Sequence, residues 1–148
     1  MWTAKWGLGV PTRPDVPAGT TLDVFARFGT AEWITNSRNT ADEHVVRTLA
    51  SMAGFSPRLN HQADSLDLVQ DMIAAGMGVG LLPMGHALLP GVRLLPLTSP
   101  DIELRSYAVA RHGRLDWPPL ALVTGLLATR AGRRAAPPGH DGDGVPAE

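Results

Sequence analysis

The stretch DSLDLVQDMIAAGMGVGLLP, from Asp64 to Pro83, decides the fold that this sequence predicts. Its apolar residues recur at steps of three and four, the spacing of one helical face. These residues are Leu66, Val69, Met72, Ile73 and Met77. We expect Gly76 to end the helix, because the position just past a helix often needs a positive φ, which glycine adopts easily. The apolar run 79–82, stopped by Pro83, predicts a strand buried on both faces.

The glycines at the end of this stretch admit a second interpretation, which the order of elements argues against. Gly76, Gly78 and Gly80 resemble part of the glycine fingerprint of dinucleotide-binding proteins. That fingerprint needs a strand before the glycines and a helix after them, so that the helix N-terminus receives a pyrophosphate. Here the predicted helix precedes the glycines and the strand follows them. Close packing of the helix against the strand is therefore the preferred interpretation.

The segment before Asp64 repeats the alternation of strand and helix. Residues 32–35 are typical of a strand, and Thr40 to Glu43 fits a capping box, in which both side chains satisfy free amides at a helix start. Residues 58–63 predict the next strand. The order from about residue 31 to Pro83 is thus β-α-β-α-β. Such alternation predicts an α/β fold with a parallel sheet and helices on its faces.

The two ends of the chain give weaker patterns. We expect residues 1–30 to form an irregular hinge segment, with at most a short helix over 21–29. Residues 131–148 lack apolar periodicity and predict a disordered tail. The sequence therefore predicts one domain over residues 31–130. Its remaining predicted elements are strands over 92–97 and 105–111 and a helix over 117–129.

Composition bounds the class of protein. The chain has 148 residues, of which 44% are hydrophobic and 18% are charged, as suits one soluble globular domain. No apolar run approaches the roughly 20 residues that span a bilayer, and the N-terminus lacks the apolar segment of a secretory signal. The absence of cysteine excludes disulfides, a thiolate nucleophile and a cysteine metal site. We therefore expect a cytoplasmic protein that does not bind membranes.

The charge pattern argues against nucleic-acid binding by this chain. The formal net charge is −1, and the 13 Lys and Arg residues are scattered along the sequence. A module that binds duplex DNA usually presents a basic face that neutralises several phosphates. The sequence shows neither such a face nor a helix-turn-helix pattern.

Five short segments form an ordered set of motifs along the chain. They are Glu32 to Ile34, Ala53 to Pro57, Ile73 to Pro83, Val92 to Leu97 and Ser106 to Arg111. Taken together, these motifs resemble the C-terminal effector-binding domain of the LysR-type transcriptional regulators. The order and spacing agree over roughly residues 20–130.

The resemblance implies a lobe of a type 2 periplasmic-binding-protein-like fold, with a small-molecule effector held between two lobes. The family's winged helix-turn-helix and most of its first lobe have no counterpart here, so the implied fold is an incomplete, truncated one. It would comprise the second lobe plus the strand and helix that return to the first. We expect such a fragment to bind an effector weakly or not at all by itself. Its uncovered apolar edges would favour pairing into a homodimer.

Two polar corners are the candidate effector-binding sites, because ligands of a parallel sheet sit at the carboxyl ends of its strands. The first corner, Asn36 to Thr40, suits a carboxylate, since a helix N-terminus carries partial positive charge. The alternative is that Thr40 only caps the helix and the other residues form a solvated loop. The second corner precedes the next helix, where Asp64 and Ser65 are more readily explained as caps. Met84, just beyond the third strand, closes the same edge. The candidate residues are Asn36, Ser37, Arg38, Asn39, Thr40, His61, Asp64, Ser65 and Met84.

Catalytic and metal sites find little support. His61, Asp64 and Ser65 include the residue types of a catalytic triad, but no nucleophile elbow accompanies them. The five histidines lack metal-binding spacing, so we expect neither a metal nor a cofactor. The favoured function is an effector-binding regulatory domain and not an enzyme. The alternatives are a lobe of a solute-binding protein, which the lack of a signal segment disfavours, and a small α/β enzyme.

Overall fold

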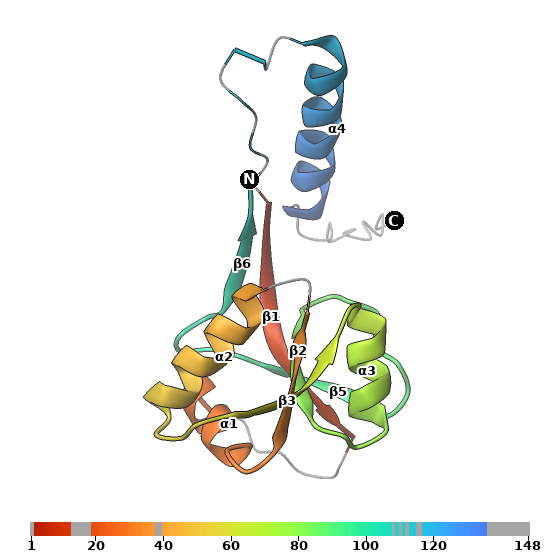
Figure 1. The fold of residues 1–148 in the computed structure, drawn as a ribbon. Helices are drawn as coiled ribbons and strands as arrows, with labels where there is room; N and C mark the ends of the chain where they lie inside the picture. The colour runs from red at the N-terminus through yellow and green to blue at the C-terminus, as the bar shows by residue number, and fades with distance from the viewer. Residues whose placement is uncertain are drawn as a thin grey trace, which may run out of the picture. The chain divides into compact units, whose positions relative to one another are not determined.

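The fold is given by a computed structural model (Figure 1). It describes residues 2–12, 19–37, 40–107, 109, 111, 113–114 and 117–135. The chain divides into two compact units, one from Ala4 to Leu104 and one that combines Met1–Thr3 with Arg105–Glu148. The first unit holds most of the sheet and three of the helices described below. The candidate residues all lie within it.

Six strands and four helices follow one another along the described chain. In order they are β1 Trp2–Pro11, α1 Thr21–Arg27, β2 Glu32–Asn36, α2 Thr40–Met52, β3 Arg58–Ala63, α3 Leu66–Ala74, β4 Val79–Pro83, β5 Val92–Pro96, β6 Glu103–Ser106 and α4 Pro118–Ala135. The sheet has the order β3-β2-β4-β1-β5, and β6 pairs with β1 off this path.

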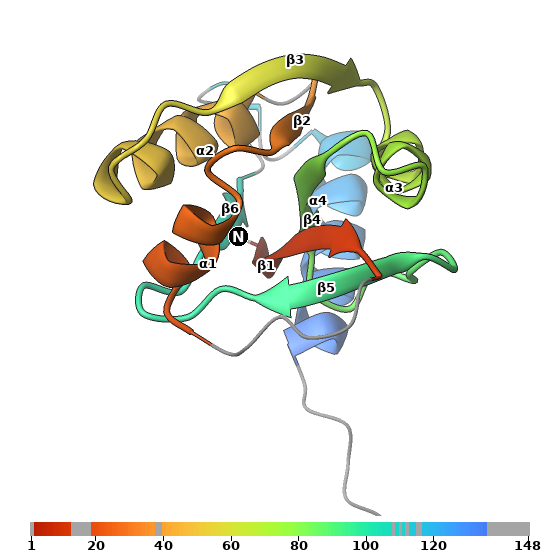
Figure 2. The ribbon, with the colours of Figure 1, turned by 90° about the horizontal axis from the view of Figure 1, so that it is seen from below.

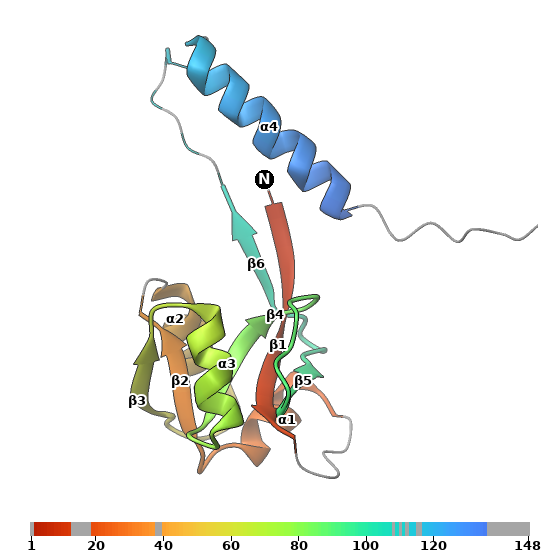
Figure 3. The same cartoon turned by 90° about the vertical axis from the view of Figure 1, so that its right-hand side faces the viewer.

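The predicted β-α-β-α-β arrangement is confirmed. Strand β2 pairs in parallel with β3 on one side, where Ile34 lies opposite His61, and with β4 on the other, where Trp33 lies opposite Val79 (Figure 3). Helices α1 and α2 cover one side of this sheet and α3 covers the other (Figure 2). The three strands therefore point the same way, and their carboxyl ends share one edge.

The glycines of the deciding stretch have the roles that the sequence indicates. Gly76 has a φ of +76°, the left-handed conformation expected just past α3. A Cβ at Gly80 would lie 3.0 Å from the carbonyl oxygen of Ile34 and 3.1 Å from Cγ1 of Val69 on α3. Close packing of helix against strand thus explains Gly80, as the sequence argument proposed.

The expectation of an irregular segment over residues 1–30 is wrong for β1. This strand runs antiparallel to both β4 and β5, so the sheet as a whole is mixed. Trp6, Leu8 and Val10 alternate inward and are buried, with glycines between them. A Cβ at Gly9 would lie 2.6 Å from Cδ1 of Leu82, so a side chain there would displace Leu82. The short helix expected over 21–29 is present as α1.

The core lies on both faces of the sheet. On the face of α1 and α2, Trp33 is fully buried, and its ring lies 4.7 Å from that of Phe25 between centroids. Phe55 packs on the same indole at 6.3 Å. On the other face, Val69 and Ile73 of α3 join a second cluster of buried residues. Both helical layers are therefore fixed to the strands by apolar packing.

The C-terminal elements match the predictions in part. The strand expected over 105–111 is shorter and earlier, Glu103–Ser106, and two of the expected positions lie outside the described residues. Helix α4 includes residues 131–135, so the predicted disorder is wrong for them, and residues 136–148 lie outside the described part. The domain limits at 30 and 130 stay a prediction. No helix in the described part of the chain is long and apolar enough to cross a membrane.

Candidate functional site

The carboxyl ends of β2 and β3 bring the two predicted polar corners together. Asn36 lies opposite Ala63, and the backbone N–H of Ser37 donates to the carbonyl of Ala63 over 2.8 Å. Because β4 is parallel to β2, Met84 follows at the same edge. We call this edge the rim and define it as residues 36–37, 63–65 and 83–84. The predicted common edge is confirmed for the carboxyl ends of β2, β3 and β4, whereas effector binding by its residues stays a prediction.

Ser65 is the N-cap of α3. Its Oγ accepts a hydrogen bond from the backbone N–H of Leu68 at 3.2 Å, and its carbonyl accepts from Val69 at 3.1 Å. The sequence left the cap open between Asp64 and Ser65, and the structure assigns it to Ser65. Ser65 therefore places a hydroxyl and the positive end of a helix at the rim.

The other corner is described only in part. Asn36 is half-buried at the end of β2, and Ser37 is exposed. Arg38 and Asn39 lie outside the described residues. Helix α2 begins at Thr40, but the side chain of this residue is not described, so the predicted capping box stays a prediction.

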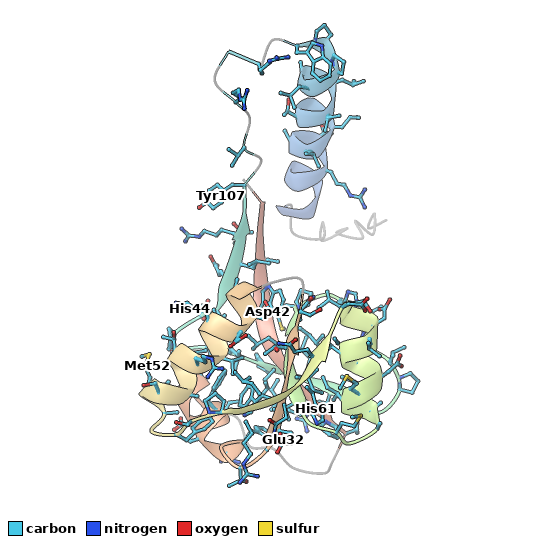
Figure 4. The ribbon with its side chains drawn as sticks, in the orientation of Figure 1. Glu32, Asp42, His44, Met52, His61 and Tyr107 are labelled. Carbon is cyan, nitrogen blue, oxygen red and sulfur yellow. The ribbon has the colours of Figure 1, made fainter. Side chains whose placement is uncertain are left out.

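His61 is not part of a rim loop. It lies within β3, opposite Ile34 and half-buried, two positions before the strand ends. Figure 4 shows His61 part-way along the sheet, whereas Asp42 stands at the upper end. The loop after β3 therefore begins at Asp64, and contact between His61 and an effector stays a prediction.

Met84 opens a loop that the protein holds firmly. Its side chain is exposed, and its backbone N–H donates to the carbonyl of Lys5 on β1 at 2.7 Å. Gln70 of α3 is buried and uses both ends of its amide on this loop. Its Nε2 donates to the carbonyl of Ala87 at 3.2 Å, and its Oε1 accepts from the N–H of Leu89 at 2.9 Å. No sequence pattern indicates this anchor, apart from a polar residue next to an apolar helical face.

A second feature was missed by the sequence analysis, namely a small cavity at the start of α2. Its volume is about 30 Å³. Asp42, 6% exposed, lines it, and burial raises the pKa of this carboxyl to about 6. Trp6 of β1 also lines it. We call it the Trp6 cavity, and its lining residues are Trp6, Ala41, Asp42, Val45, Leu81, Ile102, Glu103 and Leu104.

The described residues show no arrangement for metal chemistry. No group of three or more His, Asp or Glu side chains in this part of the chain could hold a metal ion. The polar groups at the rim and in the Trp6 cavity are hydrogen-bond donors and acceptors, together with helix N-termini. Such polar groups suit recognition of a small polar molecule.

A mixed sheet with a parallel β-α-β-α-β portion and polar corners at one edge defines a lobe of periplasmic-binding-protein-like fold. The family profile described as the LysR substrate binding domain matches residues 8–132. The chain therefore belongs to the LysR substrate binding domain family, the effector-binding regulatory domains of LysR-type transcriptional regulators. This family is one of binding domains and not of catalysts. No curated protein sequence matches the chain.

Solved structures with the same fold come from regulators of this family. A putative LysR family regulator from Pseudomonas aeruginosa is similar with a TM-score of 0.62 and 19% identity, covering 88% of this chain and 49% of that one. The CcmR regulatory domain of Synechocystis PCC6803, in complex with 2-PG, gives a TM-score of 0.57 at 14% identity. The match covers 86% of this chain and 64% of that domain. The QuiR effector-binding domain, in complex with shikimate, is similar with a TM-score of 0.60 and 12% identity. The match covers 90% of this chain and 64% of that domain. The chain thus spans about half to two thirds of these three structures.

Proposed function

We propose that this chain senses a small-molecule effector for a transcriptional regulator and that the rim binds a carboxylate group of that effector. The observation that carries the proposal is the hydrogen bond between Ser37 and Ala63, because it sets the starts of α2 and α3 at one edge. Two helix N-termini side by side favour an anion. The complexes of the QuiR domain with shikimate and the CcmR domain with 2-PG support a small anionic ligand for this fold.

Sensing then requires that the effector bind two arrangements of the protein unequally, since equal affinity shifts no equilibrium. In this proposal the response passes to DNA through a separate DNA-binding module, because the basic residues of this chain are few and scattered. A regulator of transcription works where the DNA is, so the proposed location is the cytoplasm. The proposed role is binding without catalysis.

The test is a titration of the chain with small carboxylates, followed by the backbone amide resonances in NMR. Acetate, benzoate and shikimate serve as probes, and weak binding appears as saturable shifts of the rim amides of Ser37 and Ser65. Ser65→Asp keeps an efficient cap but adds a negative charge at the rim, so carboxylate affinity should fall by about tenfold. Ser65→Asn is the matched control, because it caps without charge and should retain affinity.

Two outcomes contradict the proposal. The first is the absence of saturable shifts at the rim with every carboxylate. The second is equal loss of affinity in Ser65→Asp and Ser65→Asn, which would trace the effect to the cap and not to charge. Ser51→Ala, at an exposed position on α2, controls for the loss of a serine remote from the rim.

A further inference from the structure

The Trp6 cavity combines buried polar groups with an apolar lining. It lies among β1, β4, the first turn of α2 and the segment 102–104, all within the unit from Ala4 to Leu104. The backbone N–H of Trp6 donates to the carbonyl of Ile102 at 2.9 Å, which fixes two of these walls to each other. Six of the eight lining residues have apolar or aromatic side chains, and the other two are carboxylates.

Trp6, which lines this cavity, carries an unused hydrogen-bond donor. Its side chain is 6% exposed, and its Nε1 has no hydrogen-bond partner in the described part of the chain. A buried N–H without an acceptor is destabilising, so such groups usually have a partner. The Nε1 of Trp33 is also unpartnered, but that indole packs against Phe25 and Phe55 and does not line the cavity. Of these two indoles with an unpartnered N–H, only that of Trp6 belongs to a residue that lines the cavity.

The size of the cavity limits what can enter it. A cavity of roughly 10–15 Å³ holds one water molecule. The Trp6 cavity, at about 30 Å³, therefore accepts one polar group with its carbon atom, or about two waters. A complete effector does not fit. The cavity can therefore recognise one functional group of a larger molecule.

The charges around the cavity select among functional groups. Asp42 and Glu103 both line it, so an additional carboxylate would meet like charge. The nearby cation, Lys5, bonds to Asp101 at 2.8 Å, and its pKa is raised first by that partner and only lastly by Glu103. An ammonium group could bond to Asp42 but has no lone pair for the Trp6 N–H. A hydroxyl can accept from Nε1 of Trp6 and donate to the carboxylate of Asp42.

We propose that the Trp6 cavity is a specificity-determining subsite that binds an alcohol hydroxyl of the effector, with Trp6 as donor and Asp42 as acceptor. This assignment rests on the proposed function for the claim that the ligand is an effector. The assignment adds a chemical class to the proposed function, because the ligand then carries a hydroxyl group in addition to the carboxylate expected at the rim. The proposal concerns residues that the sequence patterns did not single out.

The indole N–H resonances give a direct test on the complete chain. The four tryptophans give separate indole signals, and Trp6→Phe identifies the one that belongs to Trp6. The probes are 2-propanol, acetate and ethylammonium, which are similar in size and differ in functional group. We expect 2-propanol to shift the Trp6 signal in a saturable way and to leave those of Trp33 and Trp117 in place.

Variants at Asp42 make the test specific. Asp42→Asn should weaken 2-propanol binding by about tenfold, because the hydroxyl then donates to a neutral amide oxygen instead of a charged carboxylate. Asp71→Asn, an exposed carboxyl on α3, is the matched control and should change nothing. Circular dichroism of both variants checks that they are folded.

Three results would overturn the proposal. Acetate or ethylammonium could bind at the Trp6 signal as well as 2-propanol does. All four indole signals could move together without saturation. The Trp6 N–H could also keep undiminished cross-relaxation with water at every alcohol concentration, which would assign the cavity to ordered water. If any of these occurs while the rim amides respond to carboxylates, the subsite fails and the proposed function stands. If the rim amides respond to no carboxylate, the proposed function itself fails.

Discussion

The N–H of Ser37 donates to the carbonyl of Ala63 over 2.8 Å, and this bond joins the turn after β2 to the last residue of β3. A backbone bond at this point holds the turns that follow the two strands close together, whatever side chains they carry. The polar groups of both turns are therefore presented together at the rim. The same parallel order of strands places the start of α2, with Asp42, at this end of the sheet (Figure 4).

Asp42 should make the stability of the protein depend on pH. Burial raises the pKa of its carboxyl from 3.8 to about 6 in the folded chain. Between pH 4 and pH 6 the folded state therefore binds more protons than the unfolded state, and stability falls as the pH rises through this window. A pKa difference of about two corresponds to roughly 3 kcal/mol. The contribution of Asp42 to stability is therefore least favourable above pH 6, where the buried carboxyl is ionised.

Denaturant unfolding of Asp42→Asn from pH 4 to pH 8 checks this expectation. The variant should match the wild type near pH 4 and exceed it at pH 8, by up to about 3 kcal/mol. The exposed Asp71→Asn serves as control and should keep the wild-type slope. Parallel curves for wild type and Asp42→Asn would contradict the assignment of this titration to Asp42.

Gln70 should control the order of the loop that begins at Met84. Its buried amide makes two hydrogen bonds to this loop, at Ala87 and Leu89. Gln70→Leu keeps the volume but leaves both backbone groups unpaired, which should destabilise the fold by about 1–3 kcal/mol. Hydrogen exchange at the Leu89 N–H should be faster in this variant. Unchanged exchange would show that the loop is held by other contacts, and Gln62→Leu, an exposed position on β3, is the control.

The sequence predicted the part of the fold in which neighbouring elements follow one another along the chain. From β2 to β4 each helix has a clear apolar stripe, and Gly76 marks the end of α3 unambiguously. Strand β1 was missed because Gly7 and Gly9 interrupt its apolar residues, and glycine weakens the pattern of a strand. Its partners, β4 and β5, lie far along the chain.

The candidate site was likewise predictable where it depends on elements that are neighbours along the chain, and not where it depends on distant ones. The rim could be predicted, because parallel strands bring their carboxyl ends to one edge. The Trp6 cavity could not, because Trp6 and Asp42 line the same cavity only through the pairing of β1 within the sheet. Gln70 was missed for a similar reason, since its partners belong to a loop without any regular pattern.

Two glycines should respond in opposite ways to substitution by alanine. At Gly80 the added Cβ would lie 3.0 Å from the carbonyl oxygen of Ile34, which is backbone and cannot move aside easily. Gly80→Ala should therefore destabilise the fold by about 1–3 kcal/mol. At Gly125, inside α4, nothing lies within 4 Å, so Gly125→Ala should raise helix stability by about 1 kcal/mol. Thermal unfolding of both variants, followed by circular dichroism, measures the contrast, and a stable Gly80→Ala would refute the packing argument.

Helix α4 should be the main source of self-association. Four of its large apolar side chains are at least half exposed and lie on one face of the helix. They are Leu122, Val123, Leu126 and Leu127. An exposed apolar row of this kind favours pairing of two chains. Leu126→Glu places a charge in the row and should weaken the association by about tenfold or more, as measured by sedimentation over a range of concentrations. Ala128→Glu, on the opposite face, adds the same charge and should leave association unchanged. If both variants behave alike, or if the wild-type chain stays monomeric at high concentration, the apolar row is not an interface.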